Sequence, residues 1–324
     1  MNLVHLDGVE HGCCGPAARA DAADVARIAG FPFEVVDLSD EFAATVIEDF
    51  VSEHAAGRTP NPCARCNGDI KFGAFLRRAD ELGADLVATG HYVRSERDVN
   101  GGWHLRRGAD PAKDQSYMLH MLGREQLSRS LFPVGRLPKA ETRSIAARFG
   151  LPVASKPDSQ ELCFAPSGDA GAFVRSSAPQ LVADGQIVDT GGRILGTHDG
   201  TFAFTVGQRR GIGVALGAPA YVLEKDVAAN RIVVGPQELL SRGGLETDRL
   251  SWIAGSPPAD GPFEASAQIR YRADAVPAVI EPLPGRTARV EFRAPQRAIA
   301  PGQSVVVYDG DEVLGGGRIV RALP

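Results

Sequence analysis

Two cysteines three residues apart, Cys63 and Cys66, lie in the stretch TPNPCARCNGDIKF, which runs from Thr59 to Phe72. The pair lies between a proline-containing loop and an apolar run with the spacing of a helix. Such a pair can bind a metal, can cycle between dithiol and disulfide, or can supply one thiolate for catalysis, because the thiolate is both the nucleophile and the metal ligand. The spacing alone leaves these three chemistries open.

The other cysteines narrow the choice. The chain has five in all, and the remaining three are Cys13, Cys14 and Cys163. An odd, sparse set argues against a structural disulfide framework. Zinc sites usually combine two C-x2-C-type pairs or a mixture of Cys and His, whereas the second pair here consists of adjacent residues with poor geometry for sharing a metal. We therefore expect thiol chemistry and no bound metal, with a zinc-stabilised nucleic-acid-binding protein as the alternative.

Composition limits the class of protein. The chain has 324 residues, of which 44% are hydrophobic and 23% are charged, as in a soluble globular protein of two or three domains. No apolar run approaches the ~20 residues of a membrane span, and the start lacks the features of a signal peptide. We expect a cytoplasmic protein with reduced thiols and no membrane partner. The net charge of −5 argues against whole-surface attraction to nucleic acid, and we expect no DNA partner, but it leaves local basic patches open.

The first half of the chain alternates strand and helix patterns. This alternation predicts βαβ units and a parallel sheet. Ligands of such sheets bind beyond the carboxyl ends of the strands, and Gly90 and His91 follow one predicted strand directly. The predicted strands cover residues 3–6, 33–38 and 86–89, and the predicted helices cover residues 17–30, 41–57 and 70–83.

The pattern changes after about residue 165. Short apolar runs separated by Gly, Asp and Pro, such as FAFTV, RIVVG and ARVEFRA, are typical of β structure with tight turns. The segment Ser256 to Glu264, rich in Pro and Gly, is interpreted as a linker. We therefore expect an α/β domain in residues 1–165, a small β domain in residues 166–255 and a C-terminal β domain in residues 256–324.

Several motifs together resemble one family, the tRNA-specific 2-thiouridylases (MnmA/TrmU type). They occur along nearly the whole chain: GRTPNPCARCNGDIKF, ATGHYVR, KDQSYML, KPDSQELCF, FTVGQRRGIGV and PGQSVVVYDGDEVLGGGRI. The resemblance implies a parallel-sheet domain of the adenine nucleotide α-hydrolase-like (PP-loop) type, then a small β domain and a C-terminal β-barrel. It also implies a reaction, in which ATP adenylates the C2 oxygen of the wobble uridine of tRNA and a persulfide sulfur replaces that oxygen.

The same resemblance implies two catalytic thiols. Cys66 takes the position of the nucleophile or acid–base thiol, and Cys163 takes the position that carries the persulfide, supplied by a sulfur-relay donor protein. The two would form a transient disulfide on turnover, and both should be partly exposed in electropositive surroundings. Asn61 and Pro62 match the loop that meets the target base, with residues chosen for turn shape as the alternative, and Cys63, which the resemblance gives no thiol role, is expected to line the same pocket.

Other positions match weaker contacts of the family. Leu6 and Gly90 match positions that touch ATP, although alone they indicate a core residue and a turn. His91 matches a tRNA contact but could equally be a hydrogen-bonded structural group, and charged pairs such as Lys113 and Asp114 are usually solvated surface. Arg with Tyr suits RNA, because the charge binds phosphate and the ring stacks on a base. The tRNA contacts implied by the resemblance are His91, Lys113, Asp114, Gln115, Arg270, Tyr271 and Gln303.

One departure from the family is large. The family begins with a strand and a Ser-Gly-Gly-Val-Asp-Ser loop whose backbone N–H groups bind pyrophosphate, and this chain has no such motif. Met1 matches the start of the family's second strand. We therefore expect the first strand and the phosphate loop of the site for ATP and Mg²⁺ to be missing. A start assigned too far downstream and a shortened, inactive tRNA-binding paralogue are both left open.

Overall fold

The computed structural model describes residues 15–158, 162–165, 169–214 and 217–324. The predicted strand at residues 3–6, including Leu6, lies outside the described residues, as do Cys13 and Cys14.

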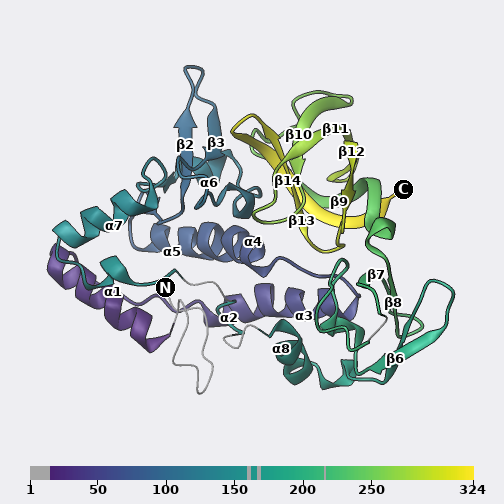
Figure 1. The fold of residues 1–324 in the computed structure, drawn as a ribbon. Coiled ribbons are helices and arrows are strands. Elements are labelled where there is room, and N and C mark those ends of the chain that lie inside the picture. Colours follow the sequence, from purple (N-terminus) through teal and green to yellow (C-terminus); the bar gives the residue numbers. More distant parts are fainter. Residues whose placement is uncertain (1–14, 159–161, 166–168, 215–216) are drawn as a thin grey trace.

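Two helical runs cross the centre of the N-terminal half side by side (Figure 1). They confirm the helices predicted at residues 41–57 and 70–83. The second run begins earlier than predicted because the Asn61 side chain accepts a hydrogen bond from the Ala64 N–H at 3.2 Å and Pro62 is the first helical residue. The first run comprises α2 (Ser39–Phe42), the π-helical η1 (Ala43–Ile47) and α3 (Glu48–Ala55), and the second comprises α4 (Pro62–Cys66), the π-helical η2 (Asn67–Ala74) and α5 (Phe75–Glu81).

A short parallel sheet confirms the α/β class. Strands β1 (Val87–Ala88) and β4 (Ser130–Leu131) pair in parallel. The strand predicted at residues 33–38 was wrong, because this segment makes only a single-residue bridge at Asp37. Its apolar pattern is that of a strand, but Phe33 and Val35 are exposed and no neighbouring strand among the described residues covers them.

The C-terminal part is a closed six-stranded barrel. The strands run in the order β13-β10-β11-β12-β9-β14, and β13 also pairs with β14, which closes the sheet. A hairpin from the N-terminal half extends this sheet, since Arg106 of the hairpin lies opposite Glu312 of β14. The hairpin strands are β2 (Val93–Arg97) and β3 (Trp103–Arg107), and the barrel strands are β9 (Ser241–Trp252), β10 (Phe263–Gln268), β11 (Val276–Leu283), β12 (Thr287–Arg297), β13 (Ser304–Asp309) and β14 (Glu312–Leu323).

Strand β9 lies before the boundary expected at residue 256. It is hydrogen-bonded to β12 and β14 inside the barrel, whereas the sequence pattern placed it in the middle segment. The segment Ser256 to Glu264 connects β9 to β10 within the barrel and is not a linker between units. A loop between two strands and a linker between domains are both rich in Pro and Gly, so composition alone could not distinguish them.

The middle segment forms a four-stranded sheet in the order β6-β5-β8-β7. None of the described helices is long and apolar enough to cross a membrane. The strands are β5 (Gly185–Val188), β6 (Ile194–His198), β7 (Tyr221–Asp226) and β8 (Arg231–Gly235). The remaining elements are α1 (Pro16–Ala29), η3 (Ser116–Met118), α6 (Arg124–Ser128), α7 (Lys139–Arg148), η4 (Pro152–Ser155), α8 (Ala170–Ser177), η5 (Pro179–Leu181), η6 (Thr201–Ala203) and η7 (Gln237–Leu240).

One hydrophobic cluster continues from the helices into the barrel. Phe72 of η2, Leu105 of β3 and Tyr308 of β13 all belong to it, and each is almost fully buried. The free energy gained from burying apolar groups is proportional to the area removed from water. Separating the helices from the barrel would expose this cluster and lose that free energy. The barrel is therefore packed as part of the same core.

Charged side chains join the hairpin to the barrel at the edge of this cluster. His104 of β3 lies 2.7 Å from a carboxylate oxygen of Glu312 and 3.1 Å from one of Asp98. The hydrogen bonds to Glu312 and Asp98 raise the pKa of His104. The charged imidazole therefore stabilises the folded state.

Replacing His104 by Gln should lower stability in a pH-dependent way. A raised pKa in the folded state gives stability that is fully present below the unfolded pKa of about 6.5 and is lost as the pH rises through the folded pKa. The difference in free energy of unfolding between wild type and His104→Gln, measured with urea at several pH values, should be largest near pH 5.5 and smaller near pH 8.5. A difference that does not change with pH would contradict this role.

Candidate functional site

The two predicted catalytic thiols contact the same hydrophobic cluster. Cys66, at the end of α4, is buried in it, and Cys163 packs against it, next to Phe164. Cys66 is 7% exposed and Cys163 is half-buried. The expectation of partial exposure therefore fits Cys163 but not Cys66, because the face of α4 that carries Cys66 packs inward. Cys63, on the same helix, is exposed.

The loop before α4 is held to the barrel by backbone and side-chain hydrogen bonds. Gln303 donates from Nε2 to the carbonyl oxygens of Thr59 at 2.8 Å and Pro60 at 3.2 Å. The Thr59 N–H donates to the Pro301 carbonyl at 2.8 Å, and Asn61 Nδ2 donates to a side-chain oxygen, Ser304 Oγ, at 3.2 Å. Asn61 and Gln303, both predicted substrate contacts, thus position this loop. Pro62 is buried at the helix start.

A cavity of about 470 Å³ lies at the carboxyl end of β1. It is lined by Lys71, Thr89, Gly90, His91 and Gln115, among others. Among the described residues, no atom beyond the two chain neighbours lies within 4 Å of where a side chain on Gly90 would begin, so these residues leave the backbone there open to a ligand. The position agrees with the rule that ligands of parallel sheets bind beyond the strand ends.

His91 is buried beside this cavity. Its Nδ1 lies 2.8 Å from Thr89 Oγ1, and its ring packs against Phe72 and Phe132. Burial lowers the pKa of His91 to about 3, so the ring is neutral at physiological pH. These contacts fit the alternative of a hydrogen-bonded structural group.

The predicted contacts at residues 113–115 anchor their own loop. Lys113 Nζ lies 2.8 Å from Asp158, whose pKa is lowered to about 2 by Lys113 and Lys139. Asp114 accepts hydrogen bonds from the N–H groups of Gly108 and Ser116, at 2.9 and 3.1 Å. In the same loop, the Gln115 side chain accepts a hydrogen bond from the Tyr92 N–H at 2.9 Å. The loop therefore has a defined shape.

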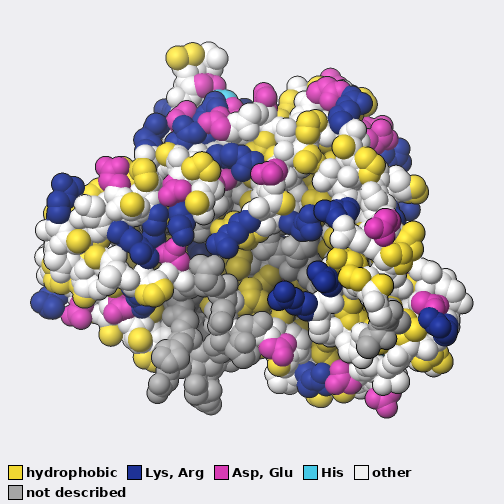
Figure 2. All heavy atoms as spheres, viewed as in Figure 1, with side chains coloured by type: hydrophobic (Ala, Val, Ile, Leu, Met, Phe, Trp, Pro, Cys, Tyr) yellow, Lys and Arg dark blue, Asp and Glu magenta, His cyan; other side chains and the backbone are white. Residues whose placement is uncertain are grey.

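The structure brings this loop beside the predicted Arg–Tyr pair. Arg270 and Tyr271 follow β10 and are exposed. Asp114 and Tyr271 line one hollow of about 240 Å³, and the Tyr271 ring lies 6.2 Å from that of Tyr117. Figure 2 shows Lys and Arg side chains gathered across the middle of the molecule, between the helical layer and the barrel. Two predicted tRNA-contacting segments thus form one surface.

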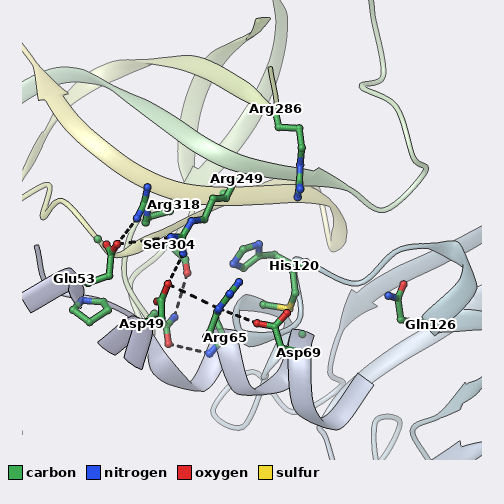
Figure 3. A pocket seen from close by; sticks show the side chains of 17 residues that line it. Asp49, Glu53, Arg65, Asp69, His120, Gln126, Arg249, Arg286, Ser304 and Arg318 are labelled. Carbon is green, nitrogen blue, oxygen red and sulfur yellow. Dashed lines mark hydrogen bonds and ion pairs between the residues drawn. The ribbon is translucent and has the colours of Figure 1, made fainter. Parts of the chain in front are cut away.

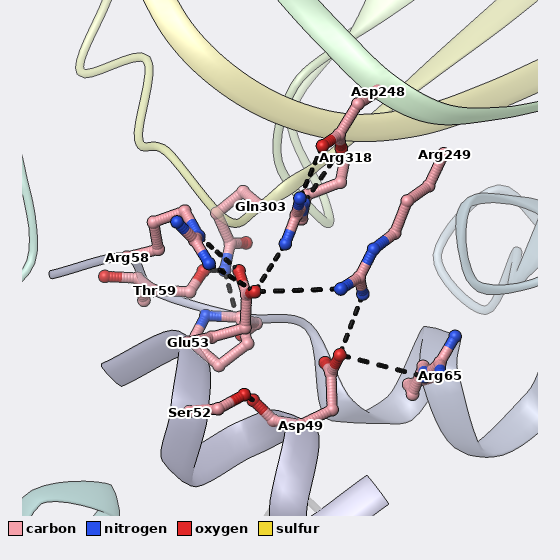
Figure 4. Close-up of polar contacts among 11 residues, drawn as sticks. Asp49, Ser52, Glu53, Arg58, Thr59, Arg65, Asp248, Arg249, Gln303 and Arg318 are labelled. Carbon is pink, nitrogen blue, oxygen red and sulfur yellow. Dashed lines mark hydrogen bonds and ion pairs between the residues drawn. The ribbon is translucent and has the colours of Figure 1, made fainter. Parts of the chain in front are cut away.

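Sequence reasoning missed a buried carboxylate network between α3 and the barrel. Glu53 is 2% exposed and forms ion pairs with Arg58, Arg249 and Arg318 (Figure 4). Asp49, one helical turn earlier, pairs with Arg249 at 2.8 Å. Like charges four residues apart destabilise an isolated helix. The spacing of Asp49 and Glu53 was therefore the one feature of the sequence that could have indicated pairing with arginines from outside this helix.

The network borders a second cavity, of about 520 Å³, between α4 and the barrel (Figure 3). It is lined by Arg65, His120 and Arg286, together with the ion-paired residues of the network. Nothing in the sequence pattern indicated that these three would meet. In the part of the chain that the structure describes, no three His, Cys, Asp or Glu side chains are grouped to hold a metal ion.

Three family models match consecutive parts of the chain. They describe a tRNA methyl transferase HUP domain at residues 2–167, a tRNA methyl transferase PRC-barrel domain at residues 172–236 and an aminomethyltransferase beta-barrel domain at residues 242–319. The tRNA-specific 2-thiouridylase MnmA of Geobacter metallireducens is 50% identical over 96% of this chain and 84% of its own length. The chain belongs to the MnmA family.

Other relatives of the same name agree with this membership. The tRNA-specific 2-thiouridylases MnmA of Heliobacterium modesticaldum and Symbiobacterium thermophilum are 50% and 47% identical, over 98% and 96% of this chain and 83% and 80% of their own lengths. The resemblance inferred from the motifs is therefore confirmed, and so is the fold class, with a HUP domain followed by two β units.

The contact between the barrel turn and the loop before α4 gives a test with a matched control. Gly302 has φ +93°, and a Cβ there would lie 2.7 Å from the Thr59 backbone nitrogen, whereas Gly255 has φ +85° and no described residue beyond its chain neighbours within 4 Å of that position. Both Gly→Ala changes strain the backbone to a similar degree. Only Gly302→Ala should also displace the loop, so its melting temperature should fall clearly further than that of Gly255→Ala in thermal denaturation. Equal losses would show that the contact contributes nothing.

Proposed function

We propose that this protein catalyses ATP-dependent 2-thiolation of the wobble uridine (U34) of tRNA. The observation that carries the proposal is the meeting of Cys66 and Cys163 at one hydrophobic cluster, although 96 residues separate them in the sequence. It is supported by the names of the relatives, which are tRNA-specific 2-thiouridylases. Sulfur transfer of this kind needs two thiols within reach of one substrate atom.

The roles of the two thiols in the proposed sulfur transfer are those that the family resemblance implies. A donor protein first loads Cys163 with a persulfide. ATP adenylates the C2 oxygen of the uridine. The terminal sulfur of the Cys163 persulfide then attacks C2, and AMP leaves with that oxygen. The Cys66 thiolate then attacks the Cys163 sulfur, which breaks the S–S bond to the transferred sulfur and releases 2-thiouridine with a Cys66–Cys163 disulfide. An external reductant restores both thiols.

The cavity at the end of β1 is the proposed site for ATP. It lies beyond a parallel strand, its backbone is open at Gly90, and Lys71 supplies a cation for phosphate. Leu6, the other predicted ATP contact, lies outside the described residues. When bound with Mg²⁺, ATP would supply the adenylate that makes the uridine oxygen a leaving group.

The proposed tRNA surface combines the loop before α4 with the Arg–Tyr pair. Cys63 is exposed next to the buried Cys66, so a base that reaches Cys63 arrives at the thiol-bearing helix. Tyr271 lines one hollow together with Asp114, and Arg270 precedes Tyr271 in the chain, so charge and ring there suit a phosphate and an unstacked base. The position of His91, with its ring buried, suits support of this surface more than contact with RNA.

Replacing Cys66 or Cys163 by Ser should abolish formation of 2-thiouridine, because each change removes one of the two sulfur atoms that the reaction needs. Cys63→Ser is the comparison variant, since it changes an exposed cysteine of the base-contacting loop that has no thiol role in the reaction; any loss should appear as weaker tRNA binding, with thiolation retained at saturating tRNA. Mass spectrometry of nucleosides from tRNA incubated with protein, ATP and a sulfur donor measures the product. Full activity of Cys66→Ser would refute the assignment, and a wild type that binds tRNA without thiolating it would favour the inactive alternative.

Replacing Arg270 by Ala should weaken tRNA binding and reduce its dependence on salt. Each lost phosphate contact lowers the slope of log affinity against log salt by about 0.7–0.9. Arg297→Ala is the control, because Arg297 is also exposed on the barrel but ends β12, whereas Arg270 follows β10 and adjoins Tyr271. Filter binding at several salt concentrations measures both quantities. Identical slopes for wild type and Arg270→Ala would show that Arg270 is only solvated surface.

A further inference from the structure

The cavity between α4 and the barrel lies on the face of α4 opposite the thiols. Asn61, Ala64, Arg65 and Gly68 line it, at the i, i+3, i+4 and i+7 spacing of one helical face. Of the described lining residues, none is a cysteine, and Cys66 packs into the hydrophobic cluster on the other side. The cavity is therefore separate from the proposed site of sulfur transfer.

The charges around this cavity favour an anion. Four arginines and three carboxylates line it. Arg318, Arg249 and Arg65 are each paired with carboxylates. Arg286 hydrogen-bonds only through Nε, to the Leu250 carbonyl at 3.0 Å, and has no ion pair with the described residues. Its terminal nitrogens are therefore available to a ligand.

A second, independent feature points into the same cavity. His120 is 6% exposed; the Gly316 backbone lies within hydrogen-bonding reach of one ring nitrogen, and the other has no hydrogen-bond partner among the residues that the structure describes. Figure 3 shows its ring between the arginines of the barrel and the side chains of Arg65 and Asp69. A buried, unpaired polar group is costly, so such groups in native proteins usually serve a ligand or a bound water.

The backbone also holds the cavity's cations in an uncommon conformation. Arg249 and Arg286 have φ values of +51° and +60°, in the left-handed region that residues other than glycine seldom occupy. The Leu250 N–H donates to the Arg286 carbonyl at 2.9 Å, which fixes the two turns against each other. Conformations of this kind concentrate at binding sites, where the surrounding structure maintains them.

We propose that this cavity is a binding site for a phosphate group, held by Arg286 from the barrel, His120 from the loop after η3 and Arg65 from α4. Guanidinium groups match the oxygens of phosphate in a bidentate fork, and the neutral imidazole can donate one N–H. A phosphate is tetrahedral, so it can meet donors from three directions, whereas a carboxylate offers two oxygens in one plane. The volume of about 520 Å³ leaves room for groups attached to the phosphate.

The test measures binding of inorganic phosphate by ³¹P NMR at constant ionic strength, with chloride as the reference anion. Arg286→Gln and His120→Leu should each raise the dissociation constant roughly tenfold or more, as expected for loss of a hydrogen bond to a charged group. Arg297→Gln, which changes an exposed barrel arginine outside the cavity, should leave it unchanged. Phosphate that binds no better than chloride, or equally well to both cavity variants, would overturn the proposal.

Thermal denaturation separates a ligand role from a structural one. His120→Leu removes a buried ring nitrogen that has no partner, so the variant should melt at about the same temperature as wild type while it binds phosphate less tightly. A structural histidine would give the opposite result, with lower stability and unchanged affinity. Arg286→Lys keeps the positive charge but lacks the two-pronged guanidinium group, so it should bind phosphate more tightly than Arg286→Gln and less tightly than wild type.

An RNA hairpin with the sequence of an anticodon arm distinguishes two sources of the phosphate. If Arg286→Gln weakens hairpin binding and phosphate competes with the hairpin, the group belongs to the RNA backbone, an outcome that rests on the proposed function. If hairpin affinity is unchanged while phosphate affinity falls, the ligand is a free phosphate. Both results support the site, and neither depends on the Cys66→Ser thiolation assay, so failure of sulfur transfer and failure of this site are separable.

Discussion

The buried carboxylate of Glu53 is the constraint on which the arrangement of the two halves depends. A carboxylate that is 2% exposed is stable only when it is paired, because its desolvation is costly and removal of a partner leaves an uncompensated charge. Arg58 follows the same helix, but Arg249 and Arg318 come from the barrel. Helix α3 can therefore bury the Glu53 carboxylate at low cost in free energy only when the barrel is docked. Docking also brings the turn at Gln303 against the loop before α4.

The apolar core and this polar network have different roles in the same interface. The shared cluster of Phe72, Leu105 and Tyr308 supplies non-directional attraction, which many relative orientations of helices and barrel could satisfy. The ion pairs of Glu53 and the hydrogen bonds of Gln303 have fixed geometry and accept one orientation. Attraction from the core and orientation from the polar contacts together position the first turn of α4.

The sequence predicted the features that depend on neighbouring residues and missed those that depend on distant ones. The helices and β1 follow from local periodicity, and their stop signals, such as Gly30 with φ +74°, are local as well. The segment 33–38 has the composition of a strand but makes only a single-residue bridge, at Asp37, and β9 was assigned to the wrong unit because its partners follow it in the chain. Glu53 and Arg318 lie 265 positions apart in the sequence, so no sequence spacing could indicate their pairing. The cysteine roles came from family resemblance and remain predictions.

Helix α4 connects the two proposed sites because its opposite faces carry different chemistry. One face buries Cys66 against the cluster that Cys163 also contacts, and the other presents Arg65 to the cavity below the barrel. An anion between Arg65 and Arg286 would add a contact from helix to barrel, and a ligand that binds only this arrangement favours it by mass action. The helix is a rigid element, so restraint on one face also restrains the other. Occupation of the cavity would therefore narrow the positions open to Cys66, which is the residue that must reach a second sulfur within bonding distance.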